Sequence, residues 1–440
     1  MGISRTQVCI KIILVTIVCF CSHCGYMGMT VNKWRLHQIQ NTLPSQKIAR
    51  ELYSDKCHTI YGRIRSVGCN TKNIAVAALS YKFGKMEIVT TTFLCGEGVY
   101  SLFLPNGEYQ IFVFTDFDQN GLFTSHECTG VFNKGKFISI TDSLPAILGG
   151  FNIFLFRPFT IERNIRIKLP PSFYCSTSKY YPSGSIRSLN DPIFSDAFGQ
   201  KGIYSPSEFL SASPNYFYTT RERDEKRTPI IFVHGYGGTP RRFSYIQSKL
   251  DSTKYEFWYF YYPSGQSIAT SGSALFEIFL SGNLNSRKNK EMIIIAHSMG
   301  GLVARYALNI LGKQESHSMK IKFISLCSPY GGSDEARSGL TQAPIIIPSW
   351  RDIASRSDFL KEMFNTPLHK SISFSLFFAF KDKSLIRGAE TSDGVIILRS
   401  QLYYLAQRDA SIIRGFDESH ESILTSRQAA EEIKLILDKD

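Results

Sequence analysis

A serine with catalytic potential stands in "IIIAHSMGGLVARY", Ile293 to Tyr306, where an apolar run passes through small residues into a helix-like pattern. A sharp turn between a strand and a helix would expose the Ser298 hydroxyl and point the helix N-terminus at it. The usual signature of such a nucleophile is G-x-S-x-G, and here Ala296 replaces the first glycine while Gly300 keeps the second. The alternative is an ordinary strand-to-helix turn that carries a surface serine.

A glycine-rich stretch, "FVHGYGG" from Phe232 to Gly238, precedes the serine and follows an apolar run. Acyl transfer needs backbone N–H groups that stabilise an oxyanion, and a loop of small residues can approach a substrate closely. We predict that the donors are the backbone N–H groups of Tyr236 and of Met299, the residue after the serine. The alternative is a turn that only closes a strand.

A serine nucleophile requires a histidine base, and the base requires an acid that orients it. After Ser298 the candidates are His317, His369 and His420. His420 is favoured because it lies between the apolar "SIIRGF" and the helical "SRQAAEEIKLIL", on a loop after the last predicted strand. A lone surface histidine is the alternative.

Two aspartates compete for the role of the acid. Asp382 in "FAFKDKS" is nearer the end of the predicted strand "SISFSLFFAF", whereas Asp393 lies in an Asp-Gly turn in "TSDGVIILRSQL". Spacing alone leaves both open, and each also fits an ordinary turn aspartate.

A separate motif, "DFDQNGLFTSHE", matches the calcium-loop pattern D-x-[DN]-x-[DN]-G-x5-E along its full length. Its predicted ligands are Asp116, Asp118, Asn120, the carbonyl of Leu122 and a bidentate Glu127. The preceding "YQIFVFT" indicates a strand, so the motif does not belong to a helix–loop–helix hand. A polar hairpin without metal is the alternative.

The surrounding patterns indicate two folded regions. Short β-branched and aromatic segments separated by turn residues predict a small all-β sandwich over residues 57–160, followed by a linker at 161–185. From residue 186 to 440, apolar strands alternate with helices, which predicts an α/β fold with a mostly parallel sheet covered on both faces. Residues 333–370 fit an inserted cap or lid; alternatively, Ile345 to Ile347 in "APIIIPSW" fill the core.

The amino terminus indicates export. Arg5 and Lys11 precede the short apolar run Ile12 to Cys21, so residues 1–24 are predicted to be a signal peptide or an N-terminal anchor, with Cys24 as a lipidation candidate. Residues 25–56 would form a linker or helical segment. We therefore expect a secreted protein or one of the cell envelope, in the periplasm or anchored to a membrane. Among six cysteines beyond the leader, five precede residue 180, which favours disulfides in the amino-terminal half, whereas Cys327 fits a buried free thiol.

The formal net charge of +13 fits an anionic lipid surface or an acidic substrate as a partner; alternatively, the charge only keeps the protein soluble. No dense basic tract or nucleic-acid motif is present, so nucleic acid is not an expected partner.

The combination of motifs from about residue 225 to 437 resembles the lipase/esterase branch of the α/β-hydrolase superfamily. The matching pieces, in order, are "FVHGYGG", "AHSMGGLVARYAL", "SLCSPYGG", "PSW…SDFLKEM", "SDGVIILRSQL" and "ESHESIL". The resemblance implies that Asp393 is the acid, with Asp382 second, and that Ala296 is a trait shared with bacterial lipases that have an Ala-x-Ser-x-Gly elbow. "NGEYQIFVFTDFDQNG" also resembles prealbumin-like or carboxypeptidase-regulatory-like sandwich modules attached to exported hydrolases.

These observations predict an exported serine hydrolase that cleaves carboxylic esters, lipid-like acyl esters above all, through Ser298, Asp393 and His420. Catalysis would need no cofactor, and calcium would be structural. The first alternative keeps the triad in a thioesterase, phospholipase or acyltransferase. The second is a surface-binding protein with a degenerate hydrolase domain. The sequence predicts no oligomeric state.

Overall fold

The computed structural model describes residues 57–438, except for 67–72, 83–84, 146, 163, 172, 174–177, 179, 183, 214, 282–290, 315–318, 344–345 and 382–389. The predicted leader (1–24) and the segment 25–56 lie outside the described residues. In the part of the chain that is described, no helix is long and apolar enough to span a membrane.

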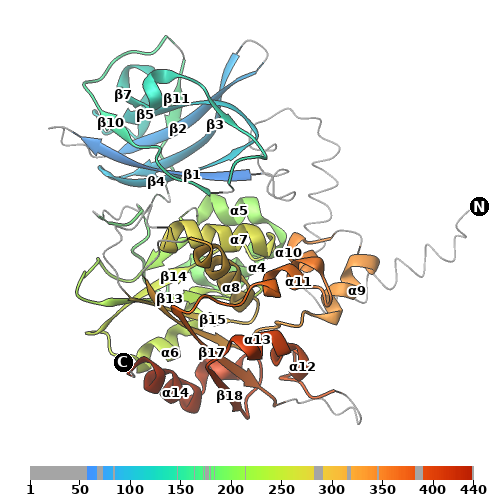
Figure 1. Ribbon diagram of the computed structural model, residues 1–440. Coiled ribbons are helices and arrows are strands. Elements are labelled where there is room, and N and C mark those ends of the chain that lie inside the picture. The colour runs from blue at the N-terminus through green and yellow to red at the C-terminus, as the bar shows by residue number, and fades with distance from the viewer. Residues whose placement is uncertain are drawn as a thin grey trace, which may run out of the picture.

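Two β-sheets form the amino-terminal region (Figure 1). The first sheet contains, in spatial order, β10 (Ile153–Leu155), β1 (Cys57–Ser66) and β4 (Gly98–Pro105), with β9 (Ile147–Leu148) also paired to β1. The second contains β3 (Lys85–Leu94), β2 (Ile74–Lys82), β5 (Gly107–Thr115) and β7 (Cys128–Val131), with β8 (Ile138–Ile140) paired to β5. Alternating residues of both sheets, such as Ile60 and Val76, are buried in a shared apolar core, as expected for two sheets packed face to face.

A short two-stranded sheet, β6 (Leu122–Thr124) paired with β11 (Arg166–Lys168), covers the other face of the second sheet. Phe123 and Ile167 from this pair pack against Ala77 and Phe114. The predicted linker 161–185 therefore contains a strand, β11. This strand has only three residues, of which only Ile167 is buried.

The carboxyl-terminal region contains a seven-stranded sheet with helices on both faces. The strand order is β12 (Phe217–Thr219), β14 (Tyr255–Phe260), β13 (Thr228–Val233), β15 (Glu291–His297), β16 (Lys320–Leu326), β17 (Ile372–Ala379) and β18 (Ile412–Phe416). All neighbouring pairs are parallel except β12 with β14.

Two groups of helices cover the sheet: α7 and α8 pack together on one side, and α6 and α14 on the other (Figure 1). Because parallel strands are covered on both faces, β15 is buried at every position after Glu291. The helices are α4 (Asp196–Tyr204), α5 (Pro206–Ala212), α6 (Ser244–Lys249), α7 (Ile268–Leu275), α8 (Met299–Gly312), α9 (Asp334–Gln342), α10 (Pro348–Ile353), α11 (Asp358–Asn365), α12 (Leu398–Gln401), α13 (Tyr404–Asp409) and α14 (Arg427–Leu437). The predicted fold class is confirmed.

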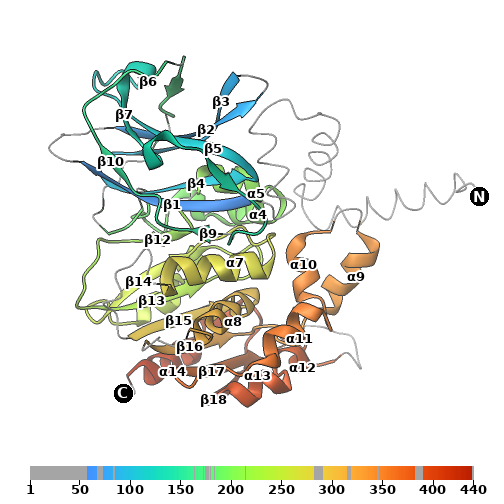
Figure 2. The ribbon, with the colours of Figure 1, turned by 45° about the horizontal axis from the view of Figure 1, so that its top comes forward.

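The first sheet of the sandwich lies directly over the carboxyl-terminal region (Figure 2). Tyr61 and Phe103 point away from the sandwich core and belong to the same apolar cluster as the central α/β sheet. The Phe103 ring lies 6.2 Å from the ring of Tyr216, and the Tyr61 hydroxyl donates a 3.2 Å hydrogen bond to the carbonyl of Asn215. The two regions thus share an apolar interface.

Candidate active site

Ser298 occupies the turn between β15 and α8, with φ 54° and ψ −130°. A non-glycine residue in this region costs about 1–3 kcal/mol and persists only when its surroundings hold it there. Two contacts do so: the Ser298 amide donates a 2.8 Å hydrogen bond to the Leu326 carbonyl, and the backbone packs tightly at Gly300. A Cβ at Gly300 would lie 2.4 Å from the Val233 carbonyl oxygen, so this glycine is required.

Ala296 lies inside β15, fully buried and paired with Val233 on one side and Ser325 on the other. The backbone there is ordinary strand, so a methyl group is compatible with the position. A glycine in its place would lose that buried methyl group and weaken the strand.

We therefore expect Ala296→Gly to lower the free energy of unfolding by about 1–2 kcal/mol, because strand entropy and methyl burial are both lost. Turnover of a p-nitrophenyl ester should change little, since Ala296 contributes no polar group to the site. Chemical denaturation and steady-state kinetics on the same preparation measure the two effects. A large loss of turnover with unchanged stability would mean that the methyl group itself shapes the turn at Ser298.

The glycine-rich loop after β13 lies against the serine. A Cβ at Gly235 would come within 2.7 Å of the Ser298 Cβ, which shows how closely the two backbones approach. The loop is anchored where the Gly237 amide donates a 2.9 Å hydrogen bond to Ser264 Oγ. Met299 is the first residue of α8, where backbone N–H groups have no partner within the helix. The structure thus brings Tyr236 and Met299 to the serine, while their role as oxyanion donors stays a prediction.

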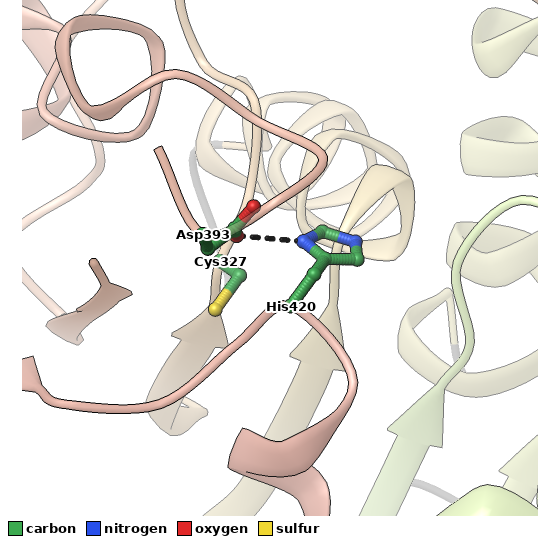
Figure 3. Close-up of side chains that lie close together, drawn as sticks. All are labelled: Cys327, Asp393 and His420. Carbon is green, nitrogen blue, oxygen red and sulfur yellow. Dashed lines mark hydrogen bonds and ion pairs between the residues drawn. The ribbon is translucent and has the colours of Figure 1, made fainter. Parts of the chain in front are cut away.

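His420 and Asp393 form a buried pair (Figure 3). The Nδ1–H of His420 donates a 2.7 Å hydrogen bond to Asp393 Oδ2, and the His420 amide donates to the Asp393 carbonyl at 2.8 Å. The other carboxylate oxygen, Oδ1, accepts from the amides of Val395 and Ile396 at 2.9 and 2.7 Å. The Asp-Gly turn thus fixes the carboxylate, which in turn fixes the imidazole.

Three other candidates compete with this pair. Asp382 and His317 fall outside the described residues. His369 lies before β17, and its Nδ1 is 2.9 Å from the hydroxyl of Ser371. Of the candidates whose positions are described, only Asp393 and His420 come together.

Ser298 and His420 line one cavity of about 190 Å³. The glycine-rich loop forms much of the rest of the wall, and most other lining side chains are polar or charged. The other lining residues are Gln200, His234, Gly235, Tyr236, Gly237, Gly238, Arg242, Phe243, His297, Glu421 and Leu424. Among the described residues, no hydrogen bond joins the Ser298 hydroxyl to His420. Catalytic hydrogen bonds are often long or poorly aligned before substrate binds, so this does not exclude the pair as nucleophile and base.

Three groups near the pair were not singled out as site residues from the sequence. His297, next to the serine, donates from Nε2 to the His420 carbonyl at 2.8 Å. His234 donates from Nδ1 to the Gly235 carbonyl at 2.8 Å and stacks on Tyr262. Both histidines directly adjoin the predicted motifs, in "VHG" and "AHS", which is the signal that could have identified them.

Cys327, directly after β16, is the third such group; it is buried and free, as the sequence predicts. Its sulfur lies within 4.8 Å of the Asp393 carboxylate and a His420 ring nitrogen (Figure 3). Burial and the Asp393 carboxylate raise the pKa of the thiol well above its usual value. A metal ligand or nucleophile must be a thiolate, so Cys327 fits neither role.

The buried histidines make stability depend on pH. Burial lowers the pKa of His234 to about 4, and it lowers the pKa of His297 well below its usual value. Between pH 4 and the unfolded pKa near 6.5, the unfolded chain binds protons that the folded chain does not. The free energy of unfolding is therefore highest above about pH 6.5 and decreases as the pH falls. For His234 the decrease reaches about 3 kcal/mol near pH 4.

We accordingly expect the denaturation midpoint to fall steeply between pH 6.5 and 4, and His234→Gln to make that fall shallower. The exposed His126→Gln is the matched control and should keep the wild-type dependence. An unchanged slope in the His234 variant would contradict this account.

The glycine-rich loop and the three candidate catalytic residues all lie at one edge of the sheet. The glycine-rich loop follows β13, and Ser298 follows the adjacent strand β15; from this pair the chain passes to β14 on one side and β16 on the other. Ligands of open α/β sheets bind at such a reversal, outside the carboxyl ends of the strands. Asp393 and His420 follow β17 and β18 at the same edge. Strand order and elbow together define an α/β-hydrolase fold.

Comparison with known proteins agrees with this class. Residues 224–361 match the family described as "Putative serine esterase (DUF676)", a match that spans less than half of the chain. No curated protein matches the chain in sequence.

Several solved structures share a weak similarity. The mature lipase BlEst2 of Bacillus licheniformis is 17% identical over 50% of this chain and 98% of its own, with a TM-score of 0.38. Aspergillus fumigatus lipase B is 15% identical over 59% of this chain and 61% of its own, also with a TM-score of 0.38. Phospholipase PlaB from Legionella pneumophila is 16% identical over 40% of this chain and 45% of its own, with a TM-score of 0.32. Such similarity carries no conclusion about the chemistry of this chain.

Proposed function

We propose that this protein is a serine hydrolase that cleaves carboxylic esters through an acyl-enzyme on Ser298. One observation carries the proposal: a serine held at positive φ lines the same cavity as a histidine whose Nδ1–H is fixed by a buried aspartate. A strained serine and an oriented imidazole at one cavity are what nucleophilic acyl transfer requires.

The chemistry follows from the orientation of His420. Because Nδ1 donates to Asp393, Nε2 carries the lone pair and can accept the hydroxyl proton of Ser298 as its oxygen attacks the ester carbonyl. The resulting imidazolium is stabilised by the Asp393 carboxylate. It then gives its proton to the departing alcohol as the carbon–oxygen bond breaks. Water then attacks the acyl carbonyl as it gives a proton to the same nitrogen. The bond to the Ser298 oxygen breaks, the imidazolium returns its proton to that oxygen, and the carboxylic acid leaves.

The backbone amides of Tyr236 and Met299 would stabilise the negative oxygen of each tetrahedral intermediate. Gly235 supports this role, because it lets the loop approach the Ser298 side chain. The Tyr236 side chain is 37% exposed, and its hydroxyl accepts a 3.0 Å hydrogen bond from Trp350 of α10. The inserted segment therefore reaches the oxyanion loop.

The insertion supports a role in substrate selection. Ile347 is buried against Ile203, so part of "APIIIPSW" fills a small core, and Trp350 packs beside them. We propose that this inserted segment forms the cap over the acyl group. The lipid-like nature of that group is part of the proposal, as is the choice between esterase, phospholipase, thioesterase and acyltransferase.

Export is a further part of the proposal. It rests on the apolar run near the amino terminus and on Cys95, which is disulfide-bonded. Structural disulfides persist in oxidising compartments, so the bond fits a secreted or envelope protein.

A fluorophosphonate probe tests the proposal, because it labels activated serines. The full-length chain should be labelled at Ser298, as mapped by mass spectrometry, and His420→Ala should react far more slowly. Ser248→Ala, on an exposed position of α6, should be labelled like the wild type. Absence of labelling would favour a degenerate surface-binding protein, and labelling at another serine would show that Ser298 is not the nucleophile. A panel of acyl esters and thioesters of increasing chain length then distinguishes among the enzyme classes.

A further inference from the structure

The loop between β5 and β7, far along the chain from the hydrolase site, gathers acidic side chains. One carboxylate oxygen each from Asp116, Asp118 and Glu127 lies within 4.8 Å of the others. In the part of the chain that is described, no lysine, arginine or histidine forms an ion pair with any of them. Three like charges at this spacing repel one another unless a cation lies between them.

The spacing fits a particular class of cation. Calcium binds oxygen ligands at 2.3–2.6 Å, so two oxygens on opposite sides of the ion lie up to about 4.6–5.2 Å apart. The three carboxylate oxygens meet that limit. The cluster offers only hard oxygen ligands, which suit calcium rather than zinc. The neighbouring His126 is exposed, and its ring bonds to Thr160 at 3.1 Å.

Asp116 gives a second, independent indication. Its side chain is 2% exposed, and its Oδ2 accepts from the Gly121 amide at 3.2 Å and the Asn73 amide group at 3.5 Å. The other oxygen, Oδ1, is buried, and no protein group among the described residues donates to it. A buried carboxylate oxygen without a donor is costly, and such orphans call for an explanation such as a bound ion.

We propose that this loop is a calcium site, with Asp116, Asp118 and Glu127 as carboxylate ligands. Glu127 Oε2 accepts from the amide and the hydroxyl of Thr124, at 2.9 and 3.0 Å. Its Oε1 accepts only from the Phe117 amide, at 3.2 Å, and keeps a further lone pair for the ion. Asn120 Oδ1 accepts a 2.6 Å hydrogen bond from the Leu122 amide. Ligation by Asn120 and by the Leu122 carbonyl completes the proposed set.

The location assigns the ion a structural role. The loop continues into β6, and the Gly121 carbonyl accepts from the Leu169 amide at 2.8 Å just after β11. Calcium would therefore hold the β6–β11 pair, with Phe123 and Ile167, against the second sheet of the sandwich. The site is independent of the proposed esterase function, since none of its residues lines the cavity at Ser298.

Isothermal titration of the EDTA-treated full-length chain with calcium chloride tests the site directly. The wild type should bind calcium at a stoichiometry near one and bind magnesium more weakly. Asp116→Asn and the exposed Asp118→Ala should each weaken calcium binding by at least about tenfold. Glu108→Gln, an exposed acid on β5, is the matched control and should bind like the wild type. No calcium uptake by the wild type, or unaltered uptake by both loop variants, would overturn the proposal.

Melting temperatures in calcium and in EDTA separate a ligand from a purely structural acid. The wild type should melt several degrees higher in calcium, because a ligand that binds only the folded state stabilises it. Asp116→Asn should lose that increment yet melt in EDTA no lower than the wild type, since it removes a buried unpaired charge. An equal drop of Asp116→Asn in both conditions would show that the carboxylate only serves the fold, which would refute the calcium role.

Discussion

Ser298→Ala is expected to lower kcat for short p-nitrophenyl esters by on the order of 10⁴-fold or more, while the chain folds normally. The mutation removes only the attacking oxygen. The backbone contacts that hold the elbow, from the Ser298 amide to the Leu326 carbonyl and from the Gly301 amide to the Ser298 carbonyl, do not involve the side chain. Steady-state kinetics and circular dichroism measure the two expectations.

Ser248→Ala provides the control for this experiment, because it removes a hydroxyl that bonds only within its own helix. Its turnover should equal that of the wild type. If Ser298→Ala retained turnover within tenfold of the wild type, another residue would have to be the nucleophile. Loss of structure in the variant would be visible in the circular dichroism spectrum and is not expected.

Asp393→Asn is expected to lower kcat by about 10³–10⁴-fold with little change in fold. The asparagine oxygen can still accept from the amides of Val395 and Ile396, so the turn should persist. Its amide group, however, donates toward Nδ1 of His420. That reverses the tautomer, leaving the proton on Nε2, so the nitrogen can no longer accept one from Ser298.

Asp382→Asn is the matched comparison, because the sequence alone makes both aspartates candidates. We expect turnover close to the wild type for this variant. A large loss in Asp382→Asn alone, with Asp393→Asn active, would show that the buried pair with His420 is only structural. Comparable losses in both would contradict the assignment of a single acid.

Local patterns explain why much of the fold is predictable from the sequence. The buried apolar run "EMIIIAH" is followed at once by a turn residue and the helical repeat "MGGLVARYALNILG", and this combination has one common structural solution. β11 is different, because its three residues carry too little pattern to stand out from a linker. The strand forms because Ile167 is buried against the second sheet, a contact distant in sequence.

The candidate site divides in the same way. Ser298 stands in a motif whose chemistry is local, so the sequence identifies it as a candidate. The choice of Asp393 over Asp382 needed a family resemblance, because the hydrogen bond to His420 joins residues on separate loops. Cys327 shows the limit most clearly: its sequence indicates a buried thiol, but only the packing places it beside the Asp393 carboxylate.

The shared interface between the two regions has a consequence for cooperativity. Tyr61 and Phe103 are buried against aromatic residues of the carboxyl-terminal region, including Tyr216, rather than within the sandwich itself. Separation of the regions would expose these rings to water on both sides, and exposed apolar patches of that kind promote aggregation. The chain should therefore unfold in one transition, because each region loses this burial when the other unfolds.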